Sequence, residues 1–136
     1  MYKTIIVAVD LAHGEAGKAL LARARALVDQ GGTIRLLHVL EEVPSYIAAE
    51  LPRDLNDRRS AEAKVELGLL ADSDDVTIET EIRSGAASGQ IIEAAENCGA
   101  DLIMIASHRP GLSDYFIGST AARVVRHAQC SVLISR

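Results

Sequence analysis

The amino-acid sequence predicts an α/β protein in which five parallel strands form an open sheet with helices on both faces. Short apolar stretches alternate with segments of helical periodicity in the order βαβαβαβαβ. Hydrophobic residues make up 49% of the chain and aromatic residues only 3%, and such an aliphatic core suits parallel strands covered by helices. The crossovers are long enough for right-handed helical connections. With 136 residues, the chain is predicted to form a single domain over residues 1–136.

The N-terminal third predicts two strands and the helix between them. Residues 4–9 form a continuous apolar run, rich in β-branched residues, that ends at Asp10. This run predicts a central strand buried on both faces. A helix is predicted over 15–29 from apolar residues at helical spacing, namely Ala16, Leu20, Ala24 and Leu27. The glycines within 30–32 are predicted to end this helix, and residues 33–39 to form the second strand.

The middle of the chain combines one ambiguous segment with two clear ones. Residues 40–56 contain two prolines and no clean period, so they form either a loop that partly covers a site or a short helix with ragged ends. A helix is predicted over about 57–70 from apolar residues four positions apart, Ala61, Val65 and Leu69. Residues 76–83 alternate strictly between apolar and polar, which predicts a strand with one wet face at or near a sheet edge.

The C-terminal part is predicted to contain the last two strands and two helices. A helix over 90–97 has Ser88 as its expected N-cap and Gly99 as its stop. The remaining elements are predicted in the order strand, helix, strand, over 101–105, 119–127 and Ser131–Ser135.

Composition excludes several classes of protein. The net charge of −5 argues against a nucleic-acid binder, whose affinity comes largely from a basic face. No apolar run approaches the roughly 20 residues that cross a bilayer, and no signal-peptide pattern opens the sequence. We therefore expect a cytoplasmic protein without membrane insertion. Cys98 and Cys130 form no CxxC pair and are expected to be buried or half-buried apolar residues, not a disulfide framework or a thiolate metal site.

Several signatures of enzymes and metal sites are missing. The patterns GxxxxGK[ST], GxGxxG and GxSxG do not occur, which argues against a P-loop lysine, a dinucleotide turn and a hydrolase nucleophile. No two of the four histidines have the i, i+4 spacing of a helical zinc site. We predict that His38 is a hydrogen-bonded core histidine and that His127 complements the C-terminal dipole of a helix.

The strongest functional signal follows the fourth strand. A loop of small and polar residues, 106–111, precedes Gly118-Ser119-Thr120 at the start of a helix. First-turn amides have no intrahelical partner and the helix dipole favours negative charge, so this place suits phosphate. Ser119 is either the N-cap alone or also a phosphate ligand. His108 and Arg109 either donate to phosphate or ribose oxygens or are ordinary loop residues.

The carboxyl ends of the other strands supply further candidates. Ligands of open α/β sheets sit beyond these ends, where the strand order reverses, and here the ends are Asp10, Val39, Gly85 and the loop at Ala106. Asp10 is either a loop or N-cap carboxylate or a ligand group. As a ligand group it would accept from a ribose hydroxyl or a base amine, or hold Mg²⁺ through water.

With these residues placed, the chain resembles the universal stress protein family. ATP-binding members share a loop of the form G-x2-G-x9-G-[S/T]. Here Ala106 and Arg109 replace the first two glycines, and eight residues separate Arg109 from Gly118. This form is similar to the F and G subgroup of bacterial universal stress proteins, in which nucleotide binding is also known. The likeness rests on these stretches in combination: Ile6-Val7-Ala8-Val9-Asp10, Leu37-His38-Val39, the Gly85 loop, Ala106-Ser107-His108-Arg109-Pro110, Gly118-Ser119, Val125-Arg126-His127-Ala128 and Ser131-Val132-Leu133-Ile134.

The resemblance implies a Rossmann-like sheet of order 3-2-1-4-5 and a homodimer through Ser131–Ser135, a strand that would otherwise be a bare apolar edge. It implies ATP, with Mg possible, as the ligand. The adenine would meet the backbone of Val39, and the phosphates would lie by Arg109 and the start of the last helix. The implied binding residues are Ala8, Val9, Asp10, Val39, Gly85, Ile105, Ala106, His108, Arg109, Gly118, Ser119 and Thr120.

We therefore expect an ATP-binding stress-response module that responds to nucleotide and is not an efficient enzyme, although slow ATP hydrolysis or autophosphorylation is compatible with it. Two alternatives stay open. One is a nucleotide-independent interaction protein that uses the edge strand and residues 40–56 to bind a partner. The other is an enzyme of adenylate chemistry.

Overall fold

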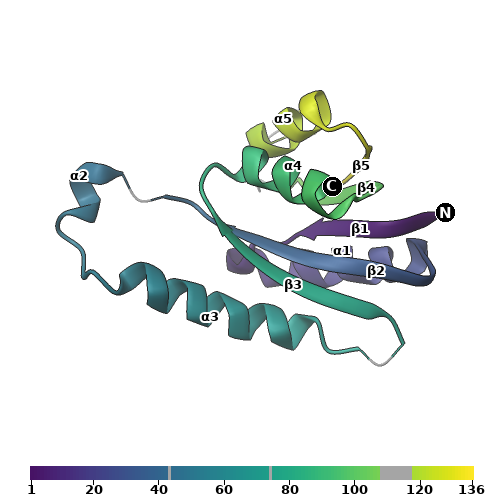
Figure 1. Ribbon diagram of the computed structural model, residues 1–136, viewed down its shortest axis with the longest axis horizontal. Coiled ribbons are helices and arrows are strands. Elements are labelled where there is room, and N and C mark those ends of the chain that lie inside the picture. The colour runs from purple at the N-terminus through teal and green to yellow at the C-terminus, as the bar shows by residue number, and fades with distance from the viewer. Residues whose placement is uncertain (43, 74, 108–117) are drawn as a thin grey trace.

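The computed structural model describes residues 1–42, 44–73, 75–107 and 118–136, and it contains a parallel sheet of five strands with the order β3-β2-β1-β4-β5 (Figure 1). Fold class and strand order are as predicted. The strands are β1 (Tyr2–Ala8), β2 (Val28–Leu40), β3 (Thr77–Ser84), β4 (Leu102–Ala106) and β5 (Ser131–Ser135). The helices are η1 (Leu11–His13), α1 (Gly14–Leu27), α2 (Ser45–Ala48), α3 (Leu55–Leu70), α4 (Ala87–Cys98) and α5 (Ser119–His127).

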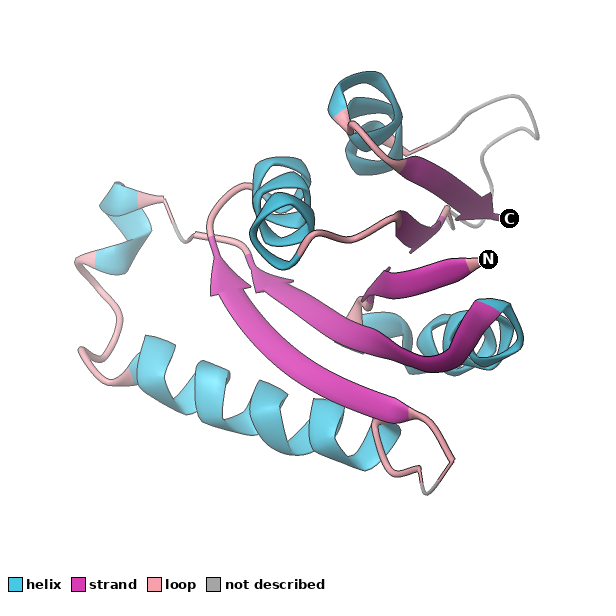
Figure 2. Cartoon of the chain, turned by 45° about the vertical axis from the view of Figure 1, so that its right-hand side comes forward, coloured by secondary structure: helices cyan, strands magenta, loops and turns pink. Residues whose placement is uncertain are grey.

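Helices cover both faces of the sheet and so divide the core into two halves. On one face α1 and α3 pack over Ile5 and Val7 of the central strand, and on the other α4 and α5 pack over Ile6 (Figures 1 and 2). All three strand residues are fully buried, because β1 lies between β2 and β4 and both of its faces are covered. The prediction of a central strand buried on both faces is confirmed.

The end of α1 differs from the prediction. The helix stops at Leu27, and the glycines expected to end it belong to β2, which already begins at Val28. Tyr2 pairs with Val28, and the β1–β2 register then shifts before Thr4 pairs with Thr33. Gly31 has a φ of 81°, and a Cβ on Gly32 would lie 2.8 Å from the carbonyl oxygen of Lys3. These glycines therefore allow the register shift between β1 and β2. Hydrophobic periodicity within one segment cannot predict such a contact between two strands.

Helix α3 is present where predicted, but the apolar stripe that predicted it faces solvent. Val65 and Leu69 are 65% and 76% exposed, whereas Leu67 between them is 0% exposed. Leu67 packs into the core beneath α3 instead, and Ala63, one turn earlier on the same side of the helix, is also buried. The helix carries apolar residues on more than one side, and packing against the edge of the sheet selects which side is buried. The segment before α3 contains the short helix α2, one of the two predicted alternatives.

Helix α5 begins at Ser119 as predicted, whereas α4 begins at Ala87, three residues before its predicted start, and the N-caps of both helices differ from the prediction. Ser88 lies inside α4, whose N-cap is Ala86, and Ser119 is the first residue of α5, whose N-cap is Gly118. Neither N-cap supplies a side-chain hydrogen bond. The Ser119 hydroxyl is therefore not occupied in capping its own helix. Gly99 ends α4 in the left-handed conformation, with a φ of 66°, as predicted.

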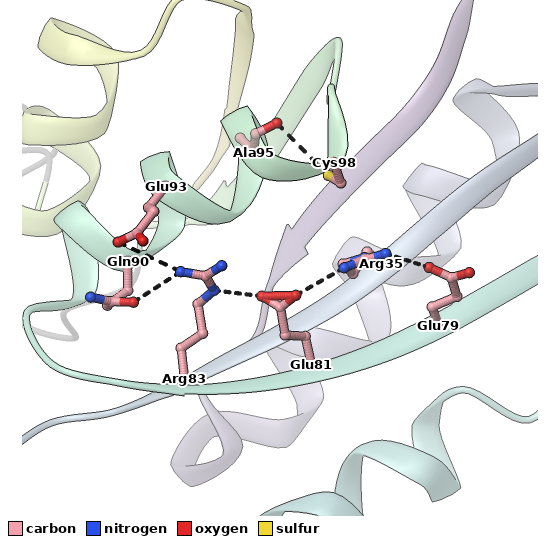
Figure 3. A network of polar contacts seen from close by, with 8 residues as sticks. All are labelled: Arg35, Glu79, Glu81, Arg83, Gln90, Glu93, Ala95 and Cys98. Atoms are coloured by element: carbon pink, nitrogen blue, oxygen red, sulfur yellow. Dashed lines mark hydrogen bonds and ion pairs between the residues drawn. The ribbon is translucent and has the colours of Figure 1, made fainter.

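The polar face of the edge strand β3 is tied to its neighbours by charged side chains (Figure 3). Arg35 of β2 donates to Glu79 over 2.7 Å and to Glu81 over 2.9 Å. Arg83 donates to Glu81 over 2.6 Å and reaches Gln90 of α4 over 3.1 Å. Burial by itself raises the pKa of Glu81, but the hydrogen bonds from the two arginines outweigh it and lower that pKa. The network fixes the start of α4 relative to the sheet.

Within the described ranges, no helix has both the length and the apolar composition that a membrane span requires. The two cysteines are half-buried, as expected, and they form no disulfide with each other in the described chain. Both pack against the core half under α4 and α5.

Candidate functional site

A cavity of about 470 Å³ opens at the carboxyl ends of β1, β2 and β4. It lies where the strand order reverses, because β1 has β2 on one side and β4 on the other. This is the position at which open α/β sheets bind their ligands. The volume falls within the roughly 300–1,000 Å³ typical of small-molecule sites.

The floor of the cavity is held by hydrogen bonds that continue β1 beyond its last strand residue. The amide of Val9 donates to the carbonyl of Leu37 over 2.8 Å. The Nδ1 atom of His38 lies 2.8 Å from the carbonyl of Val9, and because a carbonyl only accepts, Nδ1 carries the proton. The hydrogen bond predicted for His38 is confirmed, but the side chain is half-buried and does not belong to the core as predicted. The same side chain also lines the cavity, a second role that the sequence did not suggest.

Asp10 combines a structural contact with exposure to the cavity. Its Oδ1 accepts from the amide of Ala12 over 3.0 Å and so caps the short helix η1. The other carboxylate oxygen makes no hydrogen bond within the described part of the chain. Asp10 is exposed and lines the cavity. Both roles considered for it, N-cap and ligand group, are therefore geometrically available at once.

A glycine allows α1 to approach the end of β1. A Cβ placed on Gly17 would lie 2.9 Å from Cγ1 of Val9, closer than real Cβ contacts. Val9 is almost fully buried, so neither group has room to move. The absence of a side chain at Gly17 brings the first turns of α1 to the wall of the cavity, which this glycine also lines.

The opposite wall is built where β4, β5 and α5 meet. The amide of Ser107 donates to the carbonyl of Ser135 over 2.7 Å, and its Oγ accepts from the amide of Gly118 over 3.3 Å. These contacts hold the first turn of α5 against the end of β4. The amides of that turn have no intrahelical partner and mark the positive end of the helix dipole. Ser119 and Thr120, which belong to this first turn, line the cavity.

Nine of the twelve predicted binding residues line this one cavity: Ala8, Val9, Asp10, Val39, Ile105, Ala106, Gly118, Ser119 and Thr120. Gly85 does not line it. Its amide donates to the carbonyl of Leu40 over 3.0 Å, and its φ of 132° suits only glycine at the turn into α4. His108 and Arg109 lie outside the described residues.

The structure adds polar residues that sequence reasoning missed. Ser107 could have been included, since it stands within the predicted loop. Glu41 and Arg59 gave no signal, because their place depends on how residues 40–56 and α3 fold back over the strand ends. Both line the cavity, and neither forms an ion pair within the described part of the chain.

The chemistry of the cavity is that of a polar ligand site with separated charges. Carboxylates stand at Asp10 and Glu41, a guanidinium at Arg59, and helix amides at the start of α5. Across the described residues, no three His, Cys, Asp or Glu side chains come together to hold a metal ion. A water-mediated Mg²⁺ contact at Asp10 stays a prediction.

Comparison with known proteins places the chain among characterised relatives. A family profile described as "Universal stress protein family" matches residues 1–136. Universal stress protein G of Escherichia coli O157:H7 is 34% identical over 143 residues, and the match covers 100% of both chains.

Two solved structures are similar along nearly the whole chain. The structure of the hypothetical protein MJ0577 has a TM-score of 0.83 at 24% identity, and the match covers 99% of this chain and 96% of that one. At this identity the likeness shows the fold alone. A universal stress protein solved in complex with cAMP has a TM-score of 0.61 at 25% identity, and the match covers 99% of this chain and 97% of that one.

Proposed function

The chain belongs to the universal stress protein family, and from that premise we propose that its cavity binds an adenine nucleotide, ATP above all. The observation that carries this proposal is the cavity itself, which gathers a carboxylate, strand-end backbone and a helix N-terminus at the reversal point of the sheet. A relative that was solved in complex with cAMP supports an adenine nucleotide as the class of ligand. The protein would act as a nucleotide-responsive module in the stress response.

We propose an orientation in which the phosphates face α5 and the nucleoside faces β1 and β2. Phosphate oxygens would accept from the first-turn amides and the hydroxyls of Ser119 and Thr120, since hydrogen bonds to charged groups contribute about 1.5–3 kcal/mol each. The ribose would donate to the unpaired oxygen of Asp10, and the adenine would lie against the backbone at Val39. Each of these residues lines the cavity.

Calorimetric titration with ATP and Mg²⁺ tests the site. Gly118→Val places a branched side chain at the start of α5, where the phosphates would bind, so the variant is expected to lose binding. It is expected to fold, because a Cβ at this position meets no described atom within 4 Å. Gly68→Val in α3 is the matched control, because a Cβ there is equally unobstructed and Gly68 does not line the cavity. Binding that survives unchanged in Gly118→Val would contradict the site.

Asp10→Asn separates the two roles of Asp10. The amide oxygen can still cap η1 by accepting from Ala12, so the fold should be retained. The charged acceptor for the ribose is lost, and ATP affinity should fall by about tenfold, or 1.4 kcal/mol.

We also propose that the protein is a homodimer through β5. This strand pairs only with β4 and leaves its other edge without a partner among the described strands. Its central residues Val132, Leu133 and Ile134 are half-buried in the single chain. Pairing with a second copy would cover an apolar edge that otherwise invites aggregation. A cytoplasmic location stays a prediction.

A further inference from the structure

We propose that Arg59 of α3 contacts the nucleoside end of the bound nucleotide by stacking its guanidinium on the base, an inference that rests on the function proposed above. Arg59 lines the cavity although it belongs to a helix that is otherwise a cover for the sheet edge. It is the one arginine or lysine among the described residues of the lining. We therefore ask whether neighbouring carboxylates pair with this cation.

No neighbouring side chain on α3 pairs with the guanidinium of Arg59 in the described chain. Its neighbour Arg58 is satisfied within its own helix end, because Nε lies 3.2 Å from a carboxylate oxygen of Asp54. Arg59 makes no hydrogen bond or ion pair within the described chain. Glu62 stands three residues further on, at a spacing that pairs charges on a helix, yet no ion pair forms between them. The guanidinium is therefore available to the cavity.

The position of α3 decides which part of a nucleotide Arg59 meets. Helix α3 belongs to the core half that covers one face of the sheet, and α5 belongs to the half that covers the other face (Figures 1 and 2). Helix α3 packs against β2, β3 and η1. Phosphates held at the start of α5 thus leave Arg59 on the side of β2 and η1, where the base and ribose would lie.

The chemistry of arginine suits this end of the ligand. The guanidinium is planar, weakly hydrated and stacks on aromatic faces. Unstacked bases are commonly held on arginine planes, and the positive charge of the guanidinium adds a cation–π attraction to the face of the base. The carboxylates of Asp10 and Glu41 line the same cavity without pairing with Arg59, so no ion pair holds the guanidinium and its face is available to a ring.

Titration of ATP into four proteins tests this inference: the wild type, Arg59→Ala, Arg59→Lys and Arg58→Ala. We expect about tenfold weaker binding in Arg59→Ala and in Arg59→Lys, because lysine keeps the charge and loses the plane. Arg58→Ala is the matched control, because it removes the same charge from the neighbouring residue, which does not line the cavity. This variant should bind ATP as the wild type does. Unfolding temperatures without ATP serve as the folding control.

The outcomes separate this inference from the function on which it rests. If the wild type binds ATP and Arg59→Ala binds no worse than Arg58→Ala, the role of Arg59 is refuted and the proposed function stands. If Arg59→Lys binds as the wild type does, the contact is one of charge and stacking is refuted. If the wild type does not bind ATP, both the proposed function and this inference are overturned.

Discussion

Asp101 joins the start of β1 to the start of β4, and replacing it by asparagine tests how much that junction stabilises the fold. One carboxylate oxygen accepts from the amide of Lys3 over 2.8 Å and the other from the amide of Thr4 over 3.0 Å. The amide of Asp101 donates back to the carbonyl of Thr4 over 3.0 Å. Asparagine retains one acceptor and turns its NH₂ group toward a backbone N–H, so one hydrogen bond is replaced by two opposed donors.

The magnitude follows from these contacts. A hydrogen bond to a charged group contributes about 1.5–3 kcal/mol, and the partial exposure of the Asp101 junction favours the lower part of that range. We expect Asp101→Asn to lower the free energy of unfolding by about 1.5–2 kcal/mol at pH 7. For a chain of this length that corresponds to a decrease of roughly 5 °C in Tm.

The pH dependence gives the prediction its sign. Burial by itself raises the pKa of Asp101, but the hydrogen bonds from Lys3 and Thr4 outweigh it and hold that pKa below its ordinary value. A carboxyl whose pKa is lower in the folded state stabilises the fold above its unfolded pKa of about 3.9, and this contribution is lost as the pH falls through the folded value. The difference between wild type and Asp101→Asn should therefore be largest at neutral pH and shrink below about pH 4.

Urea unfolding followed by circular dichroism at several pH values measures this difference. Asp72→Asn is the matched control, because Asp72 is exposed and its carboxylate makes no hydrogen bond within the described chain. Its effect should stay within about 0.5 kcal/mol. An Asp101→Asn variant as stable as the control at pH 7, or a difference that grows on acidification, would refute the reasoning.

Two further predictions concern packing and assembly. Leu67→Ala should cost about 3 kcal/mol of unfolding free energy, because Leu67 is fully buried, whereas Leu69→Ala in the same helix should cost less than about 0.5 kcal/mol, because Leu69 is largely exposed. Equal losses in chemical unfolding would contradict the face of α3 that the structure buries. Light scattering should give a mass twice that of the 14.5 kDa chain if β5 pairs with a second copy. A single-chain mass at micromolar concentration would contradict the proposed dimer.

Local sequence predicted four of the five strands to within two residues, but it placed the start of β2 at residue 33, whereas that strand begins at Val28. The predicted boundaries of α1 and α4 also differ from the structure, by at most three residues. The apolar runs that became β1, β4 and β5 differ from the structure by at most two residues at either end. The runs of β1 and β4 are continuous because these strands are buried on both faces. The glycines at 31 and 32 misled the prediction for α1, since the same permissive backbone that ends a helix also relieves a close approach between strands. The serine at 88 misled the prediction for α4, because Ala86, which offers no capping side chain, occupies the N-cap.

The sequence alone determined the parallel sheet and the edge at which a ligand site is expected, because aliphatic runs, their order and the polar residues that follow them are properties of the chain. Only the tertiary structure decided that Leu67, and not Leu69, faces the core, because α3 carries apolar residues on several sides and the sheet buries one of them. Only the structure brought Glu41 and Arg59 to the cavity. No local sequence pattern predicts that these two residues line one cavity. Their position depends on where a helix from one crossover packs against strand ends that are distant in the sequence.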